Sequence, residues 1–256
     1  MTPTSALLMF AAAFVAGLMN SMAGGGTLAT FPTLIWLGLD PKVANATSTV
    51  ALWPGFLSAM WGYRREIEES RPLLVGLGLP SLAGGAIGTL LLIYTPTAVF
   101  TRLVPFLILF ATGLFTLQEP VSRRLRLPSL AAGAGAKWWT GAVVFQFMSS
   151  IYGGYFGAGN SILVLAALGL LGLSDIHKAN GVKNFLGACI NSVAVLGFAV
   201  SGLVNWPVAL LMALGAIAGG YVAARIARWI GRAQVRRAVV LIGLIIGFVM
   251  LWQVGR

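Results

Sequence analysis

Two clusters of glycine and small polar residues interrupt otherwise apolar stretches of the sequence. They contain Asn20, Gly24, Gly25, Gly26 and Thr27 in the first half of the chain and Gly157, Gly159 and Asn160 in the second. Each glycine destabilises a helix by about 1 kcal/mol relative to alanine, so a group of glycines favours a break in the helix. A break at membrane depth is tolerated only where its backbone lines a cavity or is buried in protein. Close packing of neighbouring helices is the other explanation for spaced glycines, and it is favoured for Gly243 and Gly247.

A second group of polar residues follows each break. Asn45, Thr47 and Ser48 are predicted to open the next helix of the first half, and Asn180 and Asn184 belong to the matching segment of the second half. Side chains of these types are ordinary N-caps, which is one explanation for them. A helix N-terminus also presents unpaired N–H groups and the positive end of the helix dipole, and these attract an anion. Two such N-termini could face one small anion between them.

Lys183 differs from the other basic residues in its position. It lies five positions beyond Lys178 and directly precedes an uncharged stretch, residues 184–224. A lysine within the membrane costs about 2.5 to 3.5 kcal/mol on insertion scales, so it either lines a transport pathway or extends its side chain to the interface. From the sequence both explanations stay open.

Acidic and metal-binding residues are nearly missing from the apolar stretches. Asp40 and Asp175 lie at segment ends, whereas a cation transporter is expected to bury its acids. One cysteine, Cys189, and one histidine, His177, exclude a protein-only zinc or haem site of ordinary ligand count. An intramembrane serine protease would need a base at membrane depth, but His177 lies in a predicted loop. The sequence therefore predicts an anion as the substrate, no metal, no cofactor and no enzymatic activity.

Stretches without any charged residue make up most of the chain. The 256 residues are 58% apolar and include 17 basic and 6 acidic residues, far fewer charges than a soluble domain carries. An uncharged apolar stretch of about 18 residues or more is typical of a membrane-spanning helix. The composition predicts an all-α polytopic protein in a lipid bilayer, with basic loops that set topology and no nucleic-acid partner. The uncharged stretches are 1–39, 43–63, 72–101, 103–118, 138–174, 184–224 and 238–255.

The sequence consists of two related halves. A shift of 135 positions aligns Ala44-Asn45 with Ala179-Asn180, and a slightly smaller shift aligns the two glycine clusters. The same 135-residue shift pairs Ser48 with Lys183, so only one half contributes a positive charge at that position. We interpret residues 1–118 and 138–256 as two transmembrane repeats. Residues 119–137, which are rich in arginine and proline, are interpreted as a basic cytoplasmic linker.

Basic residues lie in different loops of the two halves. The loop with Arg64, Arg65 and Arg71 has an uncharged counterpart at 201–207, whereas the uncharged residues 95–101 have a counterpart with five arginines at 225–237. Because lysine and arginine stay cytoplasmic, matching loops are predicted to lie on opposite faces of the membrane. The repeats are therefore predicted to be inverted, with three or five crossings each, broken or re-entrant helices at their starts, and both chain termini outside.

The first glycine cluster belongs to a longer pattern. It reads Gly17-Leu18-Met19-Asn20-Ser21-Met22-Ala23-Gly24-Gly25-Gly26-Thr27, followed by Pro32, Leu37-Gly38-Leu39, Pro41 and Ala44-Asn45-Ala46-Thr47-Ser48. The second half repeats it in degenerate form, with Gly157-Ala158-Gly159 for the triplet and Gly181-Val182-Lys183 for Ala-Thr-Ser. Over nearly the whole chain the pattern resembles the sulfite exporter TauE/SafE family. The resemblance implies a bacterial inner-membrane permease for sulfite, a sulfonate or a related sulfur oxyanion.

Together, the residues and the resemblance predict export of a small sulfur oxyanion driven by the membrane potential. Moving one charge through 100 mV is worth about 2.3 kcal/mol. The anion is expected to bind backbone N–H groups near Gly25 and Gly159, with Asn45, Asn180 and Lys183 around it. The alternatives are a proton-coupled or uptake carrier for another organic anion, and a membrane scaffold or assembly factor without transport. Faces of small residues allow a homodimer.

Overall fold

The computed structural model describes residues 2–22, 24–125, 136–171, 173, 175–230, 240–241, 243–245 and 247–252. Helices form nearly all of this part of the chain, and it contains no strand. The prediction of an all-α protein is therefore confirmed. The helices are α1 (Pro3–Met22), α2 (Thr27–Trp36), α3 (Pro41–Gly62), α4 (Arg64–Glu69), α5 (Arg71–Tyr94), α6 (Thr97–Leu125), α7 (Ala136–Tyr155), α8 (Asn160–Leu170), α9 (Ile176–Val200) and α10 (Trp206–Ile230).

The long helices suit a lipid bilayer. Among the described residues, four helices are long and apolar enough to cross a membrane, and these are α1, α5, α6 and α9. Large apolar side chains point outward from the bundle; Leu79, Leu196 and Leu210 are 70%, 67% and 63% exposed. Such a surface is stable against hydrocarbon and unfavourable in water. The chain is a multi-pass membrane protein.

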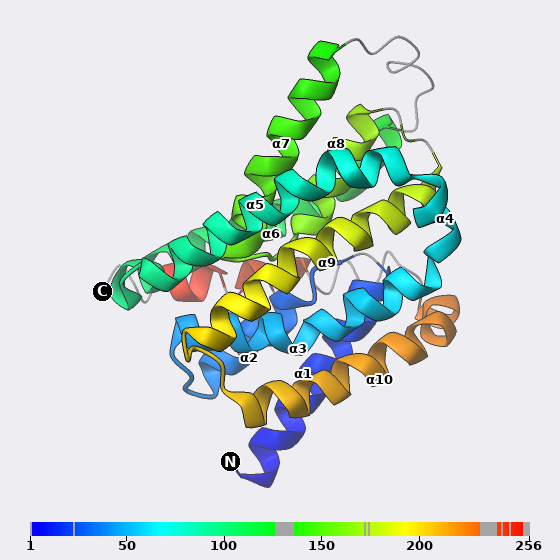
Figure 1. The fold of residues 1–256 in the computed structure, drawn as a ribbon. Coiled ribbons are helices and arrows are strands. Elements are labelled where there is room, and N and C mark those ends of the chain that lie inside the picture. Colours follow the sequence, from blue (N-terminus) through cyan, green and yellow to red (C-terminus); the bar gives the residue numbers. More distant parts are fainter. Residues whose placement is uncertain are drawn as a thin grey trace.

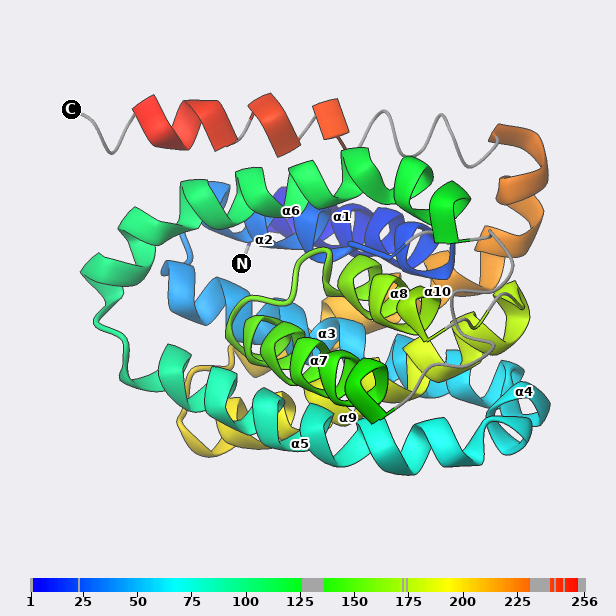
Figure 2. The same ribbon diagram turned by 90° about the horizontal axis from the view of Figure 1, so that it is seen from above.

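Two short helices each follow a longer one and pack back against it. α2 has 10 residues and α8 has 11, so each is only about 15 Å long and cannot cross a bilayer. α2 contacts α1, and α8 contacts α7. Figure 2 shows α7 and α8 as neighbours joined by a short irregular segment. The break predicted at the start of each half is present, at residues 24–26 and 156–159.

Helices of the first half pack on helices of the second. α1 crosses and packs against α10, α5 crosses and packs against α7, and α3 packs against α9 (Figure 1). Glycines allow backbone contact at the first two of these crossings. A Cβ atom at Gly84 would lie 2.6 Å from the carbonyl oxygen of Phe147 in α7, and a Cβ at Gly219 would overlap the carbonyl oxygen of Phe14 in α1. The bundle thus depends on positions where no side chain fits.

The C-terminal glycines serve the same purpose. A Cβ atom at Gly243 would overlap the side chain of Thr112, and one at Gly247 would lie 2.7 Å from a methyl carbon of Leu109, both in α6. The explanation by close helix packing is therefore confirmed for Gly243 and Gly247.

Aspartates, and not asparagines, stand at the starts of α3 and α9. α3 and α9 each start four residues before Asn45 and Asn180, so the predicted helix starts are wrong. The Asp40 carboxylate accepts hydrogen bonds from the N–H groups two and three residues ahead at 2.9 and 3.4 Å, and Asp175 does the same at 2.8 and 3.3 Å. Aspartate is among the best N-caps, and at α3 it is followed by Pro41, which also favours a helix start. Asn45 and Asn180 consequently lie inside their helices.

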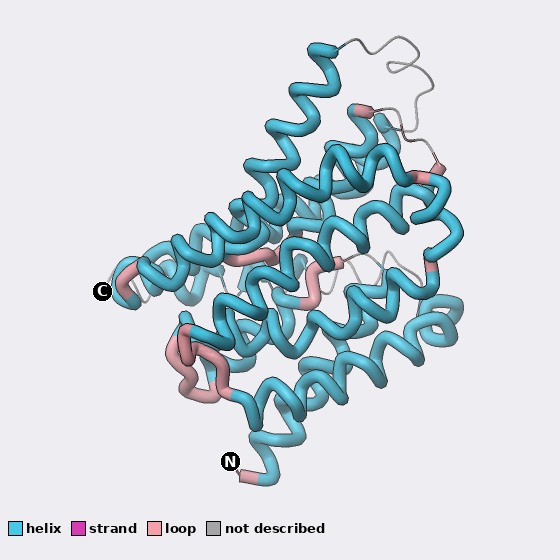
Figure 3. The backbone as a smooth tube through the Cα atoms, in the orientation of Figure 1, coloured by secondary structure: helices cyan, strands magenta, loops and turns pink. Residues whose placement is uncertain are grey.

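Apart from the two breaks, which lie within the bundle, connecting segments lie at two ends of it (Figure 3). Residues 37–40, 95–96 and 201–205 lie at one end, and α4 and the start of α9 lie at the other. The predicted loop that carries Arg64 and Arg65 is folded as α4. The predicted linker 119–137 is helical at both of its ends, because α6 continues to Leu125 and α7 begins at Ala136. Its central residues, 126–135, lie outside the described residues.

Candidate functional site

The two breaks in the helices lie against each other. A Cβ atom at Gly24, in the first break, would lie 2.8 Å from the Cβ atom of Ser161, the second residue of α8. The ring of Phe31 in α2 packs edge-on against Phe156 in the second break, with ring centroids 5.2 Å apart. Residues 24 and 161 are far apart in the sequence, so the fold brings the two predicted glycine clusters together.

Glycine backbone conformations and one asparagine shape the first break. Gly24 and Gly25 have φ values of +85° and +88°, which residues with a side chain rarely adopt. The N–H group of Gly24 donates to the carbonyl oxygen of Met19 at 2.9 Å and so closes the end of α1. The Asn20 Oδ1 atom accepts a hydrogen bond from the N–H group of Gly26 at 2.7 Å. Asn20 therefore holds the break together.

In the second break a tyrosine, and not an asparagine, makes the side-chain hydrogen bond to the backbone. The N–H group of Gly157 donates to the carbonyl oxygen of Tyr152 at 3.1 Å, the counterpart of the Gly24 bond. The Tyr152 hydroxyl donates to the carbonyl oxygen of Ala158 at 2.6 Å. Sequence reasoning missed Tyr152, because nothing in the local pattern distinguishes it from a membrane-interface tyrosine.

The N-termini of the short helices are the ones suited to an anion. The N-caps of α2 and α8 are Gly26 and Gly159, which have no side chain to cap the helix, and in α2 the Asn20 Oδ1 atom accepts from the N–H group of Gly26. Both glycines are buried. In contrast, α3 and α9 are capped by Asp40 and Asp175. Because carboxylate caps oppose an anion and the positive end of a helix dipole attracts one, the candidate pair of N-termini is that of α2 and α8 and not that of α3 and α9.

Two asparagine amides flank the last turn of α7, beside these N-termini. Asn45, which is 1% exposed, donates from Nδ2 to the carbonyl oxygen of Tyr155 at 3.1 Å. The amide of Asn160 lies so close to Gly153 that a Cβ there would come within 2.7 Å of Nδ2. The Oδ1 atoms of Asn45 and Asn160 are buried, and no donor in the described part of the chain reaches either oxygen.

The hydroxyl groups of the predicted site bind other helices. The Thr47 Oγ1 atom accepts a hydrogen bond from the N–H group of Asn205 at 3.0 Å, before α10. The hydroxyls of Ser48 and Thr30 are 2.5 Å apart and join α3 to α2. Thr27 is half-buried at the start of α2. Thr47 and Ser48 thus connect α3 to the segment before α10 and to α2.

Lys183 is buried in α9 and only 6% exposed. It lies seven residues beyond the first residue of α9, or about 10 Å along the helix axis. Its neighbour Val182 packs in an apolar cluster with Leu77 and Leu168. Asn184 is buried beside it, whereas Asn180 is half-buried one turn earlier. Lys183 and Lys42 are the charged side chains that are buried in the described part of the chain.

Sequence reasoning missed two other buried polar groups. The Lys42 ammonium donates to the carbonyl oxygens of Ile93 and Thr95 at 2.9 and 2.8 Å, and so neutralises the C-terminus of α5. Gln146 in α7 is fully buried and donates to the Ser81 hydroxyl of α5 at 2.9 Å. The sequence could have indicated Gln146 as a buried polar group, since it is an amide within an uncharged apolar stretch. It could not have indicated Lys42, because the partners of Lys42 lie some 50 residues away in the sequence.

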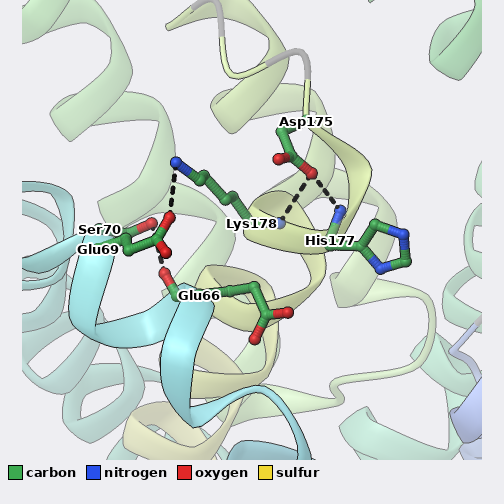
Figure 4. Close-up of polar contacts among 6 residues, drawn as sticks. All are labelled: Glu66, Glu69, Ser70, Asp175, His177 and Lys178. Atoms are coloured by element: carbon green, nitrogen blue, oxygen red, sulfur yellow. Dashed lines mark hydrogen bonds and ion pairs between the residues drawn. The ribbon is translucent and has the colours of Figure 1, made fainter.

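Charged groups at one end of the bundle join α9 to α4 (Figure 4). The Lys178 ammonium lies 2.8 Å from the Glu69 carboxylate, with the side chains 36% and 59% exposed. Hydrogen bonds from the backbone N–H groups of His177 and Lys178 lower the pKa of the Asp175 carboxyl. Because this pKa is below its unfolded value, the stabilisation by Asp175 is present at neutral pH and is lost as the pH falls through the lowered pKa.

Removing the Lys178–Glu69 ion pair should affect stability little. Exposed pairs contribute about 0 to 1 kcal/mol, so Lys178→Gln and Glu69→Gln are expected to unfold close to the wild-type temperature. Thermal unfolding of the purified protein in detergent measures this. A loss of more than about 2 kcal/mol in either single variant would show that the pair contributes more than its exposure allows.

Comparisons with known proteins converge on one group of membrane proteins. The family described as "Sulfite exporter TauE/SafE" matches residues 9–250. A "Probable membrane transporter protein" of Haemophilus influenzae is 30% identical over 253 residues, which cover 97% of this chain and 95% of the relative. The "Probable membrane transporter protein YfcA" of Escherichia coli K12 is 28% identical over 254 residues, 96% of this chain and 89% of the relative. No solved structure matches this chain significantly.

Proposed function

The chain belongs to the sulfite exporter TauE/SafE family, and on that premise we propose that it exports sulfite or an organosulfonate across the bacterial inner membrane. Its relatives are named as membrane transporters, and it has the apolar helices of a multi-pass membrane protein. The observation that carries the proposal is the meeting of two helix N-termini with glycine N-caps, those of α2 and α8, inside the bundle.

Electrostatics at the breaks favours an anion over a cation. Each helix N-terminus carries the equivalent of about half a positive charge. No Asp or Glu occurs in the sequence of α2, α7, α8 or the two breaks. Lys183, in the second half, adds a full positive charge within the bundle, whereas its counterpart in the first half is the uncharged Ser48. A small oxyanion between α2 and α8 would have donors on two sides and no carboxylate opposing it.

We further propose that the two halves are inverted repeats. If α1, α2, α3 and α5 correspond to α7, α8, α9 and α10, contacts between helices occur in matching pairs. The α1–α10 contact corresponds to α7–α5, α1–α2 to α7–α8, and α3–α10 to α9–α5. The backbone contact between Gly84 and Phe147 likewise corresponds to that between Gly219 and Phe14. The arrangement supports three crossings per half, with α1–α2 and α7–α8 as re-entrant pairs.

The basic residues orient this arrangement. Arg64 and Arg65 begin α4 and Arg71 begins α5, at the end of the bundle where α9 also starts (Figure 1). By the positive-inside rule this end is cytoplasmic, and both chain termini then lie outside. An anion that leaves an inside-negative cell moves down the membrane potential, so export needs no further energy source. A proton-coupled or uptake carrier would share the site and differ in its driving force.

Ligand-induced stabilisation tests whether the site exists. The purified protein should unfold at a higher temperature with sulfite or 2-hydroxyethanesulfonate, because a ligand that binds only the folded state stabilises it. Chloride at the same ionic strength is the control and should stabilise less. A uniform response to all three anions, or no response, would contradict a selective sulfur-oxyanion site and would favour a scaffold without transport activity.

Replacing Lys183 should weaken anion binding. Without its charge, Lys183→Gln is expected to raise the Kd for sulfite about tenfold, which corresponds to about 1.4 kcal/mol. Lys178→Gln is the matched control, since it removes an exposed lysine from the same helix. Both variants are measured by thermal stabilisation across a sulfite titration. An unchanged Kd in Lys183→Gln, or an equal change in both variants, would exclude Lys183 from the site.

A further inference from the structure

We propose that the transported anion carries a hydrogen-bond donor of its own, and is hydrogensulfite or a sulfonate with a hydroxyl group. A donor-free anion such as the sulfite dianion would not satisfy the site. This inference rests on the function proposed above and specifies its substrate. It is carried by two buried amide oxygens, those of Asn45 and Asn160, at the break between α7 and α8.

Asn45 is oriented by its own hydrogen bond. Its Nδ2 atom donates to the carbonyl oxygen of Tyr155, the last residue of α7, at 3.1 Å. Only the nitrogen of an amide can donate to a carbonyl, so this bond assigns Oδ1 to the opposite side. Asn45 is 1% exposed, and Oδ1 has no donor within the described residues. The structure therefore presents a fixed acceptor at the end of α7.

Asn160 presents a second acceptor at the same break. It is the first residue of α8, it is 8% exposed, and its amide is folded against Gly153 in the last turn of α7. Its Oδ1 atom is likewise buried, out of reach of every donor that the structure describes. The helix that begins here has no side-chain cap. Backbone donors and amide acceptors thus occur within one turn of each other.

These two kinds of group bind different parts of a ligand. N–H groups at a helix N-terminus attract the charged oxygens of an oxyanion. A buried amide oxygen repels those oxygens and needs an O–H or N–H partner, since an unpaired buried acceptor loses the hydrogen bond that it makes in water. A site of this kind rejects an analogue that lacks the donor by a large factor.

Matched sulfonates test the inference on the wild-type protein. Ethanesulfonate and 2-hydroxyethanesulfonate carry the same charge and differ by one hydroxyl group. By thermal stabilisation, 2-hydroxyethanesulfonate is expected to bind at least about tenfold more tightly than ethanesulfonate. Sulfite should bind more tightly as the pH falls, because the hydrogensulfite fraction rises, whereas ethanesulfonate binding should not change over the same range.

Two variants locate the acceptors. Asn45→Leu and Asn160→Leu should each reduce the preference for 2-hydroxyethanesulfonate over ethanesulfonate to about threefold or less, while ethanesulfonate still binds. Asn191→Leu is the control, because the Asn191 amide donates within α9 to the carbonyl oxygen of Gly187 at 2.8 Å. It should keep the wild-type preference. If Asn45→Leu does not fold without its bond to Tyr155, the wild-type comparison tests the donor requirement and Asn160→Leu tests the role of the amide oxygens.

The possible failures are distinguishable. Equal binding of the two sulfonates by the wild-type protein would overturn the donor requirement and leave sulfonate binding in place. A preference that survives in both Asn45→Leu and Asn160→Leu would overturn the role of these oxygens. If no sulfonate and no sulfite species stabilises the protein at any pH, the proposed function fails, and the inference fails with it.

Discussion

Gly24→Ala is expected to abolish sulfite-dependent stabilisation and transport. At this position φ is +85°, and a left-handed conformation costs an alanine about 1 to 2 kcal/mol. In addition, the new Cβ atom would lie 2.8 Å from the Cβ and 3.0 Å from the Oγ atom of Ser161, so the two breaks would have to separate. Separation moves the α2 N-terminus away from that of α8, and the anion loses one of its two sets of donors.

A control and a rescue distinguish contact from backbone strain. Gly38→Ala meets a similar φ of +90°, but no atom lies within 4 Å of its Cβ, so it should lose stability and keep transport. Adding Ser161→Gly to Gly24→Ala removes the opposing Cβ and should restore a measurable part of the transport. Thermal unfolding and flux into proteoliposomes report the two effects separately. Equal transport by Gly24→Ala and Gly38→Ala would contradict contact between the breaks.

Gly219→Ala and Gly88→Ala are expected to cause the largest losses of stability. The new Cβ atoms would overlap the carbonyl oxygens of Phe14 in α1 and Ile151 in α7, and backbone atoms cannot move aside as a flexible side chain can. Overpacking of this kind costs about 3 kcal/mol or more, because two long helices must move apart. Unfolding of the purified variants by heat, or a failure to accumulate in the membrane, measures the loss.

Gly113→Ala is the matched control for these two variants. Gly113 lies in α6, and no atom lies within 4 Å of its Cβ position. The same substitution there should stabilise the helix by about 0.5 to 1 kcal/mol, as expected for alanine in place of glycine. If Gly113→Ala destabilises the protein as much as Gly219→Ala does, backbone contact between α1 and α10 does not explain the sensitivity.

Local signals in the sequence predicted the helices and their breaks. Uncharged apolar stretches identified the membrane-spanning helices, and the glycine clusters at 24–26 and 157–159 identified where they end. The starts of α3 and α9 were predicted at Asn45 and Asn180, because a polar run is a familiar N-terminal signal. Asp40 and Asp175 cap the helices five residues earlier, so the helices begin directly after these aspartates.

The part of the site that sequence could not predict depends on distant partners. The amide of Asn45 could be selected as a ligand-binding group, but its orientation depends on the carbonyl of Tyr155, 110 residues later. Likewise, the Thr47 hydroxyl pairs with the backbone of Asn205 across 158 residues. Such contacts follow from the way the two halves pack, and periodicity or spacing within one half contains no record of them.

Voltage-dependent flux in proteoliposomes is the measurement that tests the central claim most directly. Liposomes containing the purified protein and loaded with sulfite are given a potassium diffusion potential of either sign, with equal pH on both sides. Efflux should be fast when the inside is negative, slow when it is positive, and lost in Gly24→Ala. Sulfite flux that ignores voltage and requires a proton gradient would contradict potential-driven export, and no flux under either gradient would contradict transport of sulfite altogether.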